Sequence, residues 1–147
     1  MGDAGPEFVE APDPWFIVNP LTGKRAASKS GTASVRCDAA VSDLRYMLWE
    51  MDEVPVGDQI RFWTSVVRES LLPVASVTMS GGKSVHALVR VGCRTIEEWD
   101  RVVRVNLLSQ LAVQMGADKA CGNPSRMSRL AGVREEGRGV QWLLYLG

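Results

Sequence analysis

The sequence predicts an α+β domain with an antiparallel sheet, and three observations lead to this fold class. Two alternating apolar segments, 74–79 and 85–91, are joined by the turn Ser-Gly-Gly-Lys-Ser, which is typical of a β-hairpin. Two other stretches, 55–71 and 95–115, repeat their apolar residues at the spacing of a helix. Further strand-like segments precede the first helical stretch and follow the second. Strands and helices in this order favour a sheet covered by helices.

The boundaries of the individual elements follow from local signals. The first strand is predicted at 44–51, and the first helix begins at Pro55, because proline is common in the first turn of helices. The second helix opens at Thr95, where Glu98 completes a capping box, and it ends at Gly116. The apolar residues at helical spacing, which are the predicted core positions, are Ile60, Trp63, Val67 and Leu71 in the first helix and Ile96, Trp99, Val103, Leu107, Leu111 and Met115 in the second.

Two more strand-like segments, 126–133 and 140–146, complete the chain. The order is β-α-β-β-α-β plus one further strand, which is the ferredoxin-like (RRM-like, RNA-recognition-motif) arrangement. Its helices cover one face of the antiparallel sheet and leave the other face free for ligands and an active site. Residues 1–42, rich in Pro, Gly, Ser and Ala and without a sustained period, are interpreted as a loop-rich N-terminal arm, and 43–147 as the folded core.

Composition and charge bear on the class of protein. The chain of 147 residues has a formal net charge of zero, which argues against a strongly basic, non-specific DNA-binding protein. The charges are unevenly distributed: residues 1–60 hold five Lys/Arg and ten Asp/Glu, whereas 61–147 hold twelve and seven. An acidic part and a basic part suit a site that collects metal ions on one side and phosphates on the other. The same distribution of charges is also explained by ordinary surface residues that contact only water.

Cysteine content and apolar segments indicate the compartment. Cys37, Cys93 and Cys121 are too few and too widely spaced for a disulfide framework or a structural zinc site, which favours reduced thiols in a cytoplasmic protein. The acidic N-terminus MGDAGPEFVE lacks the basic and apolar regions of a signal peptide. No segment reaches the apolar length of a membrane span, so no membrane partner is expected.

Side chains alternate between the two faces of a strand, and this alternation places the candidate site residues on one face of the sheet. In the second hairpin strand the apolar odd-numbered residues are expected to meet the helices, which places His86 on the opposite face. Glu50 and Asp52 are two residues apart and share a face, and burying both carboxylates under helices would be costly, so they are assigned to the open face as well. Lys83 and Ser80 then lie in the turn at its edge.

These residue types are suited to binding a metal ion and phosphates. Paired carboxylates supply the oxygen ligands that Mg²⁺ and Mn²⁺ prefer, with Glu53 as an alternative member of the pair. A turn with free N–H groups, a lysine and an imidazole suits phosphates. Simpler interpretations are a solvated acidic edge, a structural histidine and an ordinary turn. A P-loop is not indicated, because Val77 stands where its first glycine is needed and a strand, instead of a helix, follows the turn.

Three segments carry a resemblance to a known family: LWEMDEV at 48–54, SGGKSVH at 80–86 and ADKACGNPSRMSRLAGV at 117–133. In this order they resemble the three motifs of the archaeo-eukaryotic primase (AEP) superfamily, especially the primase-polymerase domains of phages, prophages and plasmids. The resemblance implies a catalytic core over 43–147 that synthesises or extends primers on single-stranded DNA by two-metal nucleotidyl transfer. A helicase or accessory domain, in the same protein or in trans, is the implied partner.

The resemblance also implies roles for individual residues. The implied ligands of catalytic Mg²⁺ or Mn²⁺ are Glu50, Asp52 and Asp118. The implied contacts to the triphosphate of an NTP or dNTP are Ser80, Lys83 and His86, and His86 is counted with the three acidic residues as catalytic. Arg126 and Arg129 are implied to contact nucleotide or template phosphate, and Asn123 helps to shape their loop.

Two other functions stay open on the sequence. A non-catalytic nucleic-acid or nucleotide-binding module of a replication initiator would use the same fold, but the predicted open face offers carboxylates where an RNA reader has stacking aromatic residues. Trp49 has the wrong parity for that face, and Tyr46 is the nearby candidate. A metal-dependent nuclease or relaxase would cleave with His86 and the acidic pair, but such sites usually need several histidines or a nucleophilic tyrosine.

Overall fold

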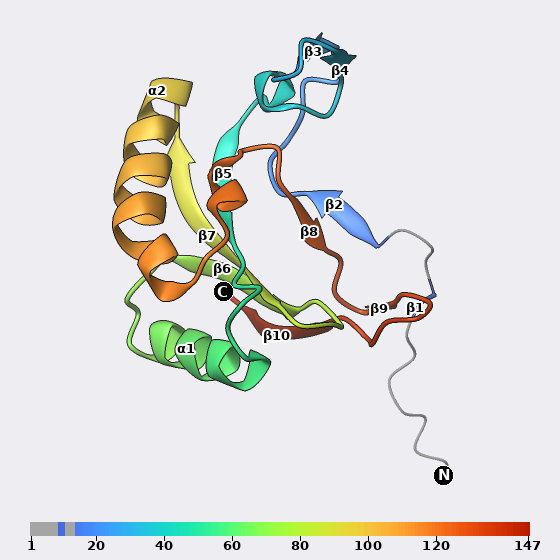
Figure 1. The fold of residues 1–147 in the computed structure, drawn as a ribbon, viewed down its shortest axis with the longest axis vertical. Helices are drawn as coiled ribbons and strands as arrows, with labels where there is room; N and C mark the ends of the chain where they lie inside the picture. Colours follow the sequence, from blue (N-terminus) through green and yellow to red (C-terminus); the bar gives the residue numbers. More distant parts are fainter. Residues whose placement is uncertain (1–8, 11–13) are drawn as a thin grey trace.

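The computed structural model describes residues 9–10 and 14–147 and is built around an antiparallel sheet of four strands (Figure 1). The strand order across the sheet is β10 (Trp142–Leu146), β6 (Val74–Met79), β7 (Val85–Cys93) and β5 (Leu44–Trp49). The predicted hairpin is confirmed, because β6 and β7 pair antiparallel on either side of the turn. The predicted α+β class with an antiparallel sheet is confirmed as well.

Two helices pack on the same face of this sheet (Figure 1). They are α1 (Val56–Arg68) and a longer helix that consists of an α-helical start, α2 (Ile96–Trp99), a π-helical stretch, η2 (Asp100–Ala112), and a 3₁₀ turn, η3 (Val113–Met115). The hydroxyl of Thr95 caps the second helix as predicted, and Gly116, with φ of +87°, ends it. Trp49, Trp63 and Trp99 are each at most 1% exposed in the core between helices and sheet.

The π-helical stretch changes which residues of the second helix are buried. Trp99 and Val103 are buried as predicted, but beyond them Leu108 and Ala112 are buried, whereas Leu111 is 39% exposed. A π-helical turn bonds residues five apart instead of four, which moves the buried stripe by one position. The prediction of Leu111 as a core residue is therefore wrong. Predicted core positions at or beyond the helix ends are also exposed, namely Leu71, Ile96 and Met115.

A second layer covers the opposite face of the sheet. β2 (Trp15–Ile17) pairs antiparallel with β8 (Met127–Arg129), and β1 (Val9–Glu10) pairs parallel with β9 (Val133–Arg134), all on the side away from the helices (Figure 1). The apolar cluster between this layer and the sheet consists of Phe16, Val18, Tyr46, Leu48, Ala75 and Leu88. The expectation of a free face is wrong here, because part of the predicted arm covers it; residues 1–8 and 11–13 of that arm lie outside the described residues.

The strand order departs from the ferredoxin-like one at its last strand. In that order the final strand would pair with β5, but here β10 pairs with β6 and β8 lies outside the sheet. Asn19, which is 2% exposed, occupies the outer edge of β5. Its Oδ1 accepts hydrogen bonds from the N–H groups of Arg45 and Tyr46, and its Nδ2 donates to the carbonyls of Tyr46 and Pro124. A side-chain amide thus satisfies backbone groups that another strand would have used.

The remaining elements are short. β3 (Ala26–Ala27) and β4 (Ala33–Ser34) form a small hairpin, followed by η1 (Asp38–Ala40). The 3₁₀ turn η4 (Lys119–Gly122) packs against β5 and positions the third sequence motif. In the described part of the chain, no helix has the length and apolar character needed to cross a membrane.

Candidate functional site

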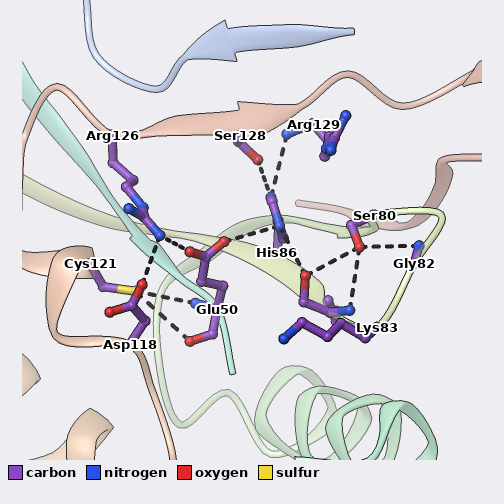
Figure 2. Close-up of polar contacts among 12 residues, drawn as sticks. Glu50, Ser80, Gly82, Lys83, His86, Asp118, Cys121, Arg126, Ser128 and Arg129 are labelled. Atoms are coloured by element: carbon purple, nitrogen blue, oxygen red, sulfur yellow. Dashed lines mark hydrogen bonds and ion pairs between the residues drawn. The ribbon is translucent and has the colours of Figure 1, made fainter. Parts of the chain in front are cut away.

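Glu50, the first residue after β5, lies at the centre of a polar cluster on the face away from the helices (Figure 2). Only 6% of this residue is exposed. Its Oε2 lies 3.1 Å from Nε2 of His86, and its Oε1 accepts a hydrogen bond from Nη2 of Arg126. The same Nη2 lies 2.9 Å from Oδ2 of Asp118. The structure therefore brings together four of the predicted site residues, from three distant parts of the chain.

Backbone hydrogen bonds fix Asp118 beside Glu50. The N–H of Asp118 donates to the carbonyl of Glu50 at 3.0 Å, and its side chain caps η4 by accepting from the N–H of Ala120 at 2.9 Å. Sγ of the fully buried Cys121 accepts from the N–H of Glu50 at 3.4 Å. This segment extends the backbone pairing of β5 beyond the end of the strand, so two carboxylates far apart in sequence share one site.

His86 is buried under β8, with hydrogen-bond partners at both ring nitrogens (Figure 2). Nδ1 lies 3.1 Å from the hydroxyl of Ser128 and 3.4 Å from the backbone nitrogen of Arg129. Because a backbone N–H only donates, Nδ1 is the acceptor, and the ring proton is assigned to Nε2, facing Glu50. Burial, followed by the positive charges of Arg129 and Arg126, lowers the pKa of His86 to about 4. The imidazole is therefore neutral at pH 7.

Burial also changes the ionisation of the other groups in the cluster. It raises the pKa of Glu50, which Arg126 partly offsets and the charges of Asp52 and Asp118 reinforce. Burial alone would lower the pKa of Arg126, but the hydrogen bond and ion pair with Glu50 outweigh it, so the guanidinium stays charged. Burial raises the pKa of the Cys121 thiol to about 12. The cluster thus holds a fixed positive charge between two carboxyl groups.

The turn between β6 and β7 is joined to His86 by hydroxyl groups (Figure 2). Oγ of Ser84 lies 3.3 Å from Nε2 of His86 and 3.2 Å from Oγ of Ser80, so a chain of polar groups leads from the imidazole into the turn. Oγ of Ser80 also accepts from the N–H groups of Gly82 and Ser84. Two N–H groups that were expected to be free for a ligand are therefore used inside the turn.

Contacts from α1 and the C-terminal region anchor this turn. Gln59, which is fully buried, donates to the carbonyl of Lys83 at 3.0 Å and accepts from the N–H of Val85 at 2.7 Å. Gly81 has φ of +78°, and its carbonyl accepts from the N–H of Gly139 at 2.8 Å. A Cβ at Gly81 would clash with the carbonyl of Gly139. Gly81 and Gly139 are therefore required by this close approach of two backbones.

Asp52 and Lys83 lie at the margin of the cluster. β5 ends at Trp49, so Asp52 belongs to the following turn, where it is half-buried, and its side chain forms no hydrogen bond or ion pair with any described residue. Its charge nevertheless acts on Glu50. The alternation of side chains along the strand therefore places Glu50 correctly on the face away from the helices, but it does not apply to Asp52, which lies beyond the strand. Lys83 is exposed in the turn, and its ammonium group has no ion pair within the described residues.

Arg129 and Asn123 lie on either side of the cluster with partners of their own. Arg129 is 2% exposed; its Nη1 lies 2.7 Å from Oε2 of Glu135, and its guanidinium stacks 3.4 Å from the ring centroid of Trp15. Oδ1 of Asn123 accepts from Nζ of Lys29 at 2.7 Å. The implied phosphate contact of Arg129 stays a prediction, and in this structure its charge is paired inside the protein.

Three residues that hold the site in place carry weak sequence signals. Gln59 stands four residues before Trp63 on the buried stripe of α1, where a polar residue is unexpected. Ser128 lies within the third motif, two residues after Arg126. Trp15 is an aromatic residue in a segment without any period, and only its pairing with β8 gives it a role.

The cluster fits a divalent cation in its ligand chemistry, because Mg²⁺ and Mn²⁺ prefer carboxylate oxygens. Across residues 9–10 and 14–147, however, no group of three or more His, Cys, Asp or Glu side chains is arranged to hold a metal ion. The guanidinium of Arg126 stands between Glu50 and Asp118 and supplies the positive charge there. The donor atoms therefore suit a metal, and Arg126 takes the place between the two carboxylates.

Comparison with known proteins bears on the fold. A solved structure, the AEP domain of the primase-polymerase (PrimPol) of cyanophage S-2L, is similar over 78% of this chain, with a TM-score of 0.56 and 24% sequence identity. The match spans 59% of the phage domain's length, which is less than two thirds of it. No protein-family model and no curated protein matches the chain. The likeness lies in the structure, and the fold is AEP-like.

Proposed function

We propose that this chain, whose fold is similar to that of a phage primase-polymerase domain, is a nucleotidyltransferase that adds NTPs or dNTPs to a primer on single-stranded DNA. The observation that carries the proposal is the cluster on the sheet face away from the helices, in which Glu50 and His86 are buried and the half-buried Arg126 bridges Glu50 to the partly exposed Asp118. Burying several ionisable groups costs several kcal/mol unless they are paired, and such clusters concentrate at functional sites.

Glu50 and Asp118 would hold Mg²⁺ or Mn²⁺, with Asp52 as a third carboxylate from the adjoining turn. When bound, the metal lowers the pKa of the primer 3′-hydroxyl and stabilises the charge of the departing pyrophosphate. Arg126 has to release both carboxylates before they act as ligands. Phosphate oxygens of the nucleotide are suitable new partners for the released guanidinium, because arginine binds phosphate with charge-assisted hydrogen bonds.

The turn and the imidazole would bind the triphosphate. The N–H at Nε2 of His86 faces Glu50 and Ser84 and would turn to a phosphate oxygen when Glu50 binds the metal. Ser80 lies at the end of the same chain of hydroxyls, and the exposed Lys83 has no ion pair with a described residue. In the reaction the 3′-hydroxyl oxygen bonds to the α-phosphorus, and the bond from that phosphorus to the pyrophosphate oxygen breaks. The hydroxyl proton passes to solvent. Neutral His86 thus acts as a hydrogen-bond donor and keeps its proton.

Primer extension tests the proposal directly. The purified protein is given a primed single-stranded DNA template, Mn²⁺ and labelled dNTPs or NTPs, one base at a time. Incorporation should follow the template base and should be lost in Asp118→Asn. The matched control is Asp58→Asn, a carboxylate on α1 that is also paired with an arginine but lies outside the cluster, and it should keep full activity. Equal rates for wild type and Asp118→Asn would contradict the proposal.

A non-catalytic nucleotide-binding module is the second candidate. The position of Arg126 favours it, because a guanidinium between the two carboxylates leaves the site stable without a metal. A module of this kind would bind NTP in the presence of a chelator and would give no extension product. The nucleotidyltransferase would bind NTP with metal and extend the primer.

A further inference from the structure

We propose that Trp15 is the surface on which the base of the bound nucleotide stacks; this inference rests on the proposed function and adds base recognition to it. A cavity of about 330 Å³ opens beside Glu50, and this volume lies in the range of small-molecule sites. The residues that line the cavity are Trp15, Glu50, Asn123, Ser125, Arg126 and Met127. An aromatic side chain and a buried carboxylate therefore border the same space.

The fold fixes the indole of Trp15 in this place. Trp15 is the register partner of Arg129 in the pairing of β2 with β8. The Arg129 guanidinium lies against one face of the indole, and Glu135 holds that guanidinium from the other end. The ring of His86 lies 6.5 Å from the ring of Trp15. Backing by a buried arginine gives the indole a defined orientation, yet 37% of Trp15 stays exposed.

The lining of the cavity matches the two ends of a nucleoside triphosphate. Glu50 and Arg126 carry the charges that the proposed function assigns to metal and phosphate. Trp15 offers a flat apolar surface. The side-chain amide of Asn123, whose Oδ1 accepts from Lys29, offers its NH₂ group for the edge of a base or for a sugar hydroxyl, whereas Ser125 is held by Asp38. Stacking on an aromatic residue is available to every base, and the larger purine ring gains most from it. The expected ligand is therefore a nucleoside triphosphate, with purines bound more tightly than pyrimidines.

A larger cavity elsewhere lacks this combination. It has a volume of about 820 Å³ and lies between η1 and the start of α2. Of the basic side chains on its wall, Lys29 and Arg104 are paired with Asp38, and the third, Arg94, faces neither Glu50 nor His86, because neither residue borders this cavity. Size alone therefore does not identify the nucleotide site.

Calorimetric titration in Mn²⁺ with two ligands separates stacking from phosphate binding. ATP carries a base, whereas inorganic tripolyphosphate carries only the phosphates. Trp15→Leu should weaken ATP binding about tenfold and leave tripolyphosphate binding unchanged. Trp15→Phe, which keeps an aromatic ring, should recover most of the ATP affinity. Trp142→Leu is the matched control, because Trp142 on β10 is 41% exposed, and it should leave both ligands unaffected.

The outcomes distinguish the two proposals. Unchanged ATP affinity in Trp15→Leu overturns the stacking role and leaves the proposed function standing. Equal weakening of both ligands also overturns it, because Trp15 would then act by holding Arg129 and His86. If wild type binds neither ligand, the proposed function and the stacking role both fail. Unchanged tripolyphosphate binding in the variant shows that it is folded. If Trp15→Leu does not fold, the affinities of wild type for ATP and CTP are compared, and equal affinities overturn the stacking role.

Discussion

The two faces of the central sheet are both covered, but with different kinds of side chains. On the helix face apolar residues surround three tryptophans, and Trp49 meets Trp63 edge-on at 5.3 Å between ring centroids. On the opposite face a small apolar cluster adjoins buried Glu50, His86 and Arg129, each of which needs a specific partner. Apolar burial stabilises the fold at the first face. At the second face buried charges lower stability unless they are paired, so this face depends on the partners of each charged group.

The largest expected effect on stability comes from disrupting the apolar packing between the helices and the sheet. Trp63→Ala should lower the free energy of unfolding by about 3–5 kcal/mol, because it removes a side chain that is 1% exposed and leaves a cavity. Leu71→Ala, at a position that is 66% exposed, should change it by less than about 0.5 kcal/mol. Urea unfolding followed by circular dichroism measures both. Similar losses in the two variants would show that the helix face is not the main source of stability.

The second expected effect is a pH dependence that belongs to the opposite face. The pKa of His86 is lowered to about 4 in the fold from 6.5, so between these values the unfolded chain binds the proton and the native protein does not. Stability should therefore fall by about 3 kcal/mol as pH decreases from 6.5 to 4. The raised pKa of Glu50 has the opposite effect on stability. Its carboxylate binds a proton in the folded protein at a higher pH than in the unfolded chain, which favours the fold as the pH decreases.

His86→Gln isolates the histidine contribution to this profile. Urea midpoints are measured across the pH range with a chelator present, and the wild-type curve is compared with that of the variant. The stability of wild type relative to the variant should increase as the pH rises from 4 to 6.5 and stay constant above pH 6.5. Parallel curves would contradict a buried neutral imidazole.

The next expected effect on stability compares two buried side-chain amides, one with hydrogen-bond partners (Asn19) and one without partners among the described residues (Gln141). Asn19→Ala should cost about 2 kcal/mol, because it leaves backbone groups at the edge of β5 without partners. Gln141 is also fully buried, but its side-chain amide has no hydrogen-bond partner among the described residues. Gln141→Leu should therefore be neutral or stabilise by up to about 1 kcal/mol. Thermal unfolding of both variants provides the comparison, and destabilisation by the leucine would show that the glutamine has a partner.

The smallest expected effect concerns Arg126. Arg126→Gln removes the positive charge between Glu50 and Asp118 and should tighten Mn²⁺ binding about tenfold, since the metal no longer competes with a charged hydrogen bond. Arg104→Gln is the matched control, because Arg104 is similarly half-buried and paired with aspartates outside the cluster. Mn²⁺ titration measures both affinities. Weaker binding in Arg126→Gln would mean that the arginine supports the metal site.

The difference between the faces also explains what the sequence could predict. The hairpin, the cap at Thr95, the stop at Gly116 and the parity of His86 depend on neighbouring residues, and all are confirmed. The second layer depends on a three-residue strand that pairs with a segment more than a hundred residues away, and no local pattern reports such a pairing. The same applies to Asn19, whose side chain takes the place of a strand.

Within the site, the sequence predicts which residues lie together, but it does not predict the ion pairs between them. Glu50, His86 and Asp118 lie together, in agreement with the motifs that singled them out. The ion pairs of Arg126 with two of them depend on side-chain geometry between distant segments, which neither spacing nor parity reveals. The assignment of Glu50, Asp52 and Asp118 as metal ligands stays a prediction.

The most direct test of the central claim is calorimetric titration of Mn²⁺ and then of a nucleoside triphosphate into wild type and Glu50→Gln. The glutamine keeps the shape of the side chain and removes the charge that the proposed metal needs. Wild type should bind the nucleotide in the presence of Mn²⁺, and the folded variant should lose that metal-dependent binding. Equal metal-dependent binding in both proteins, or none in folded wild type, would contradict the assignment of this cluster as a nucleotidyltransferase site.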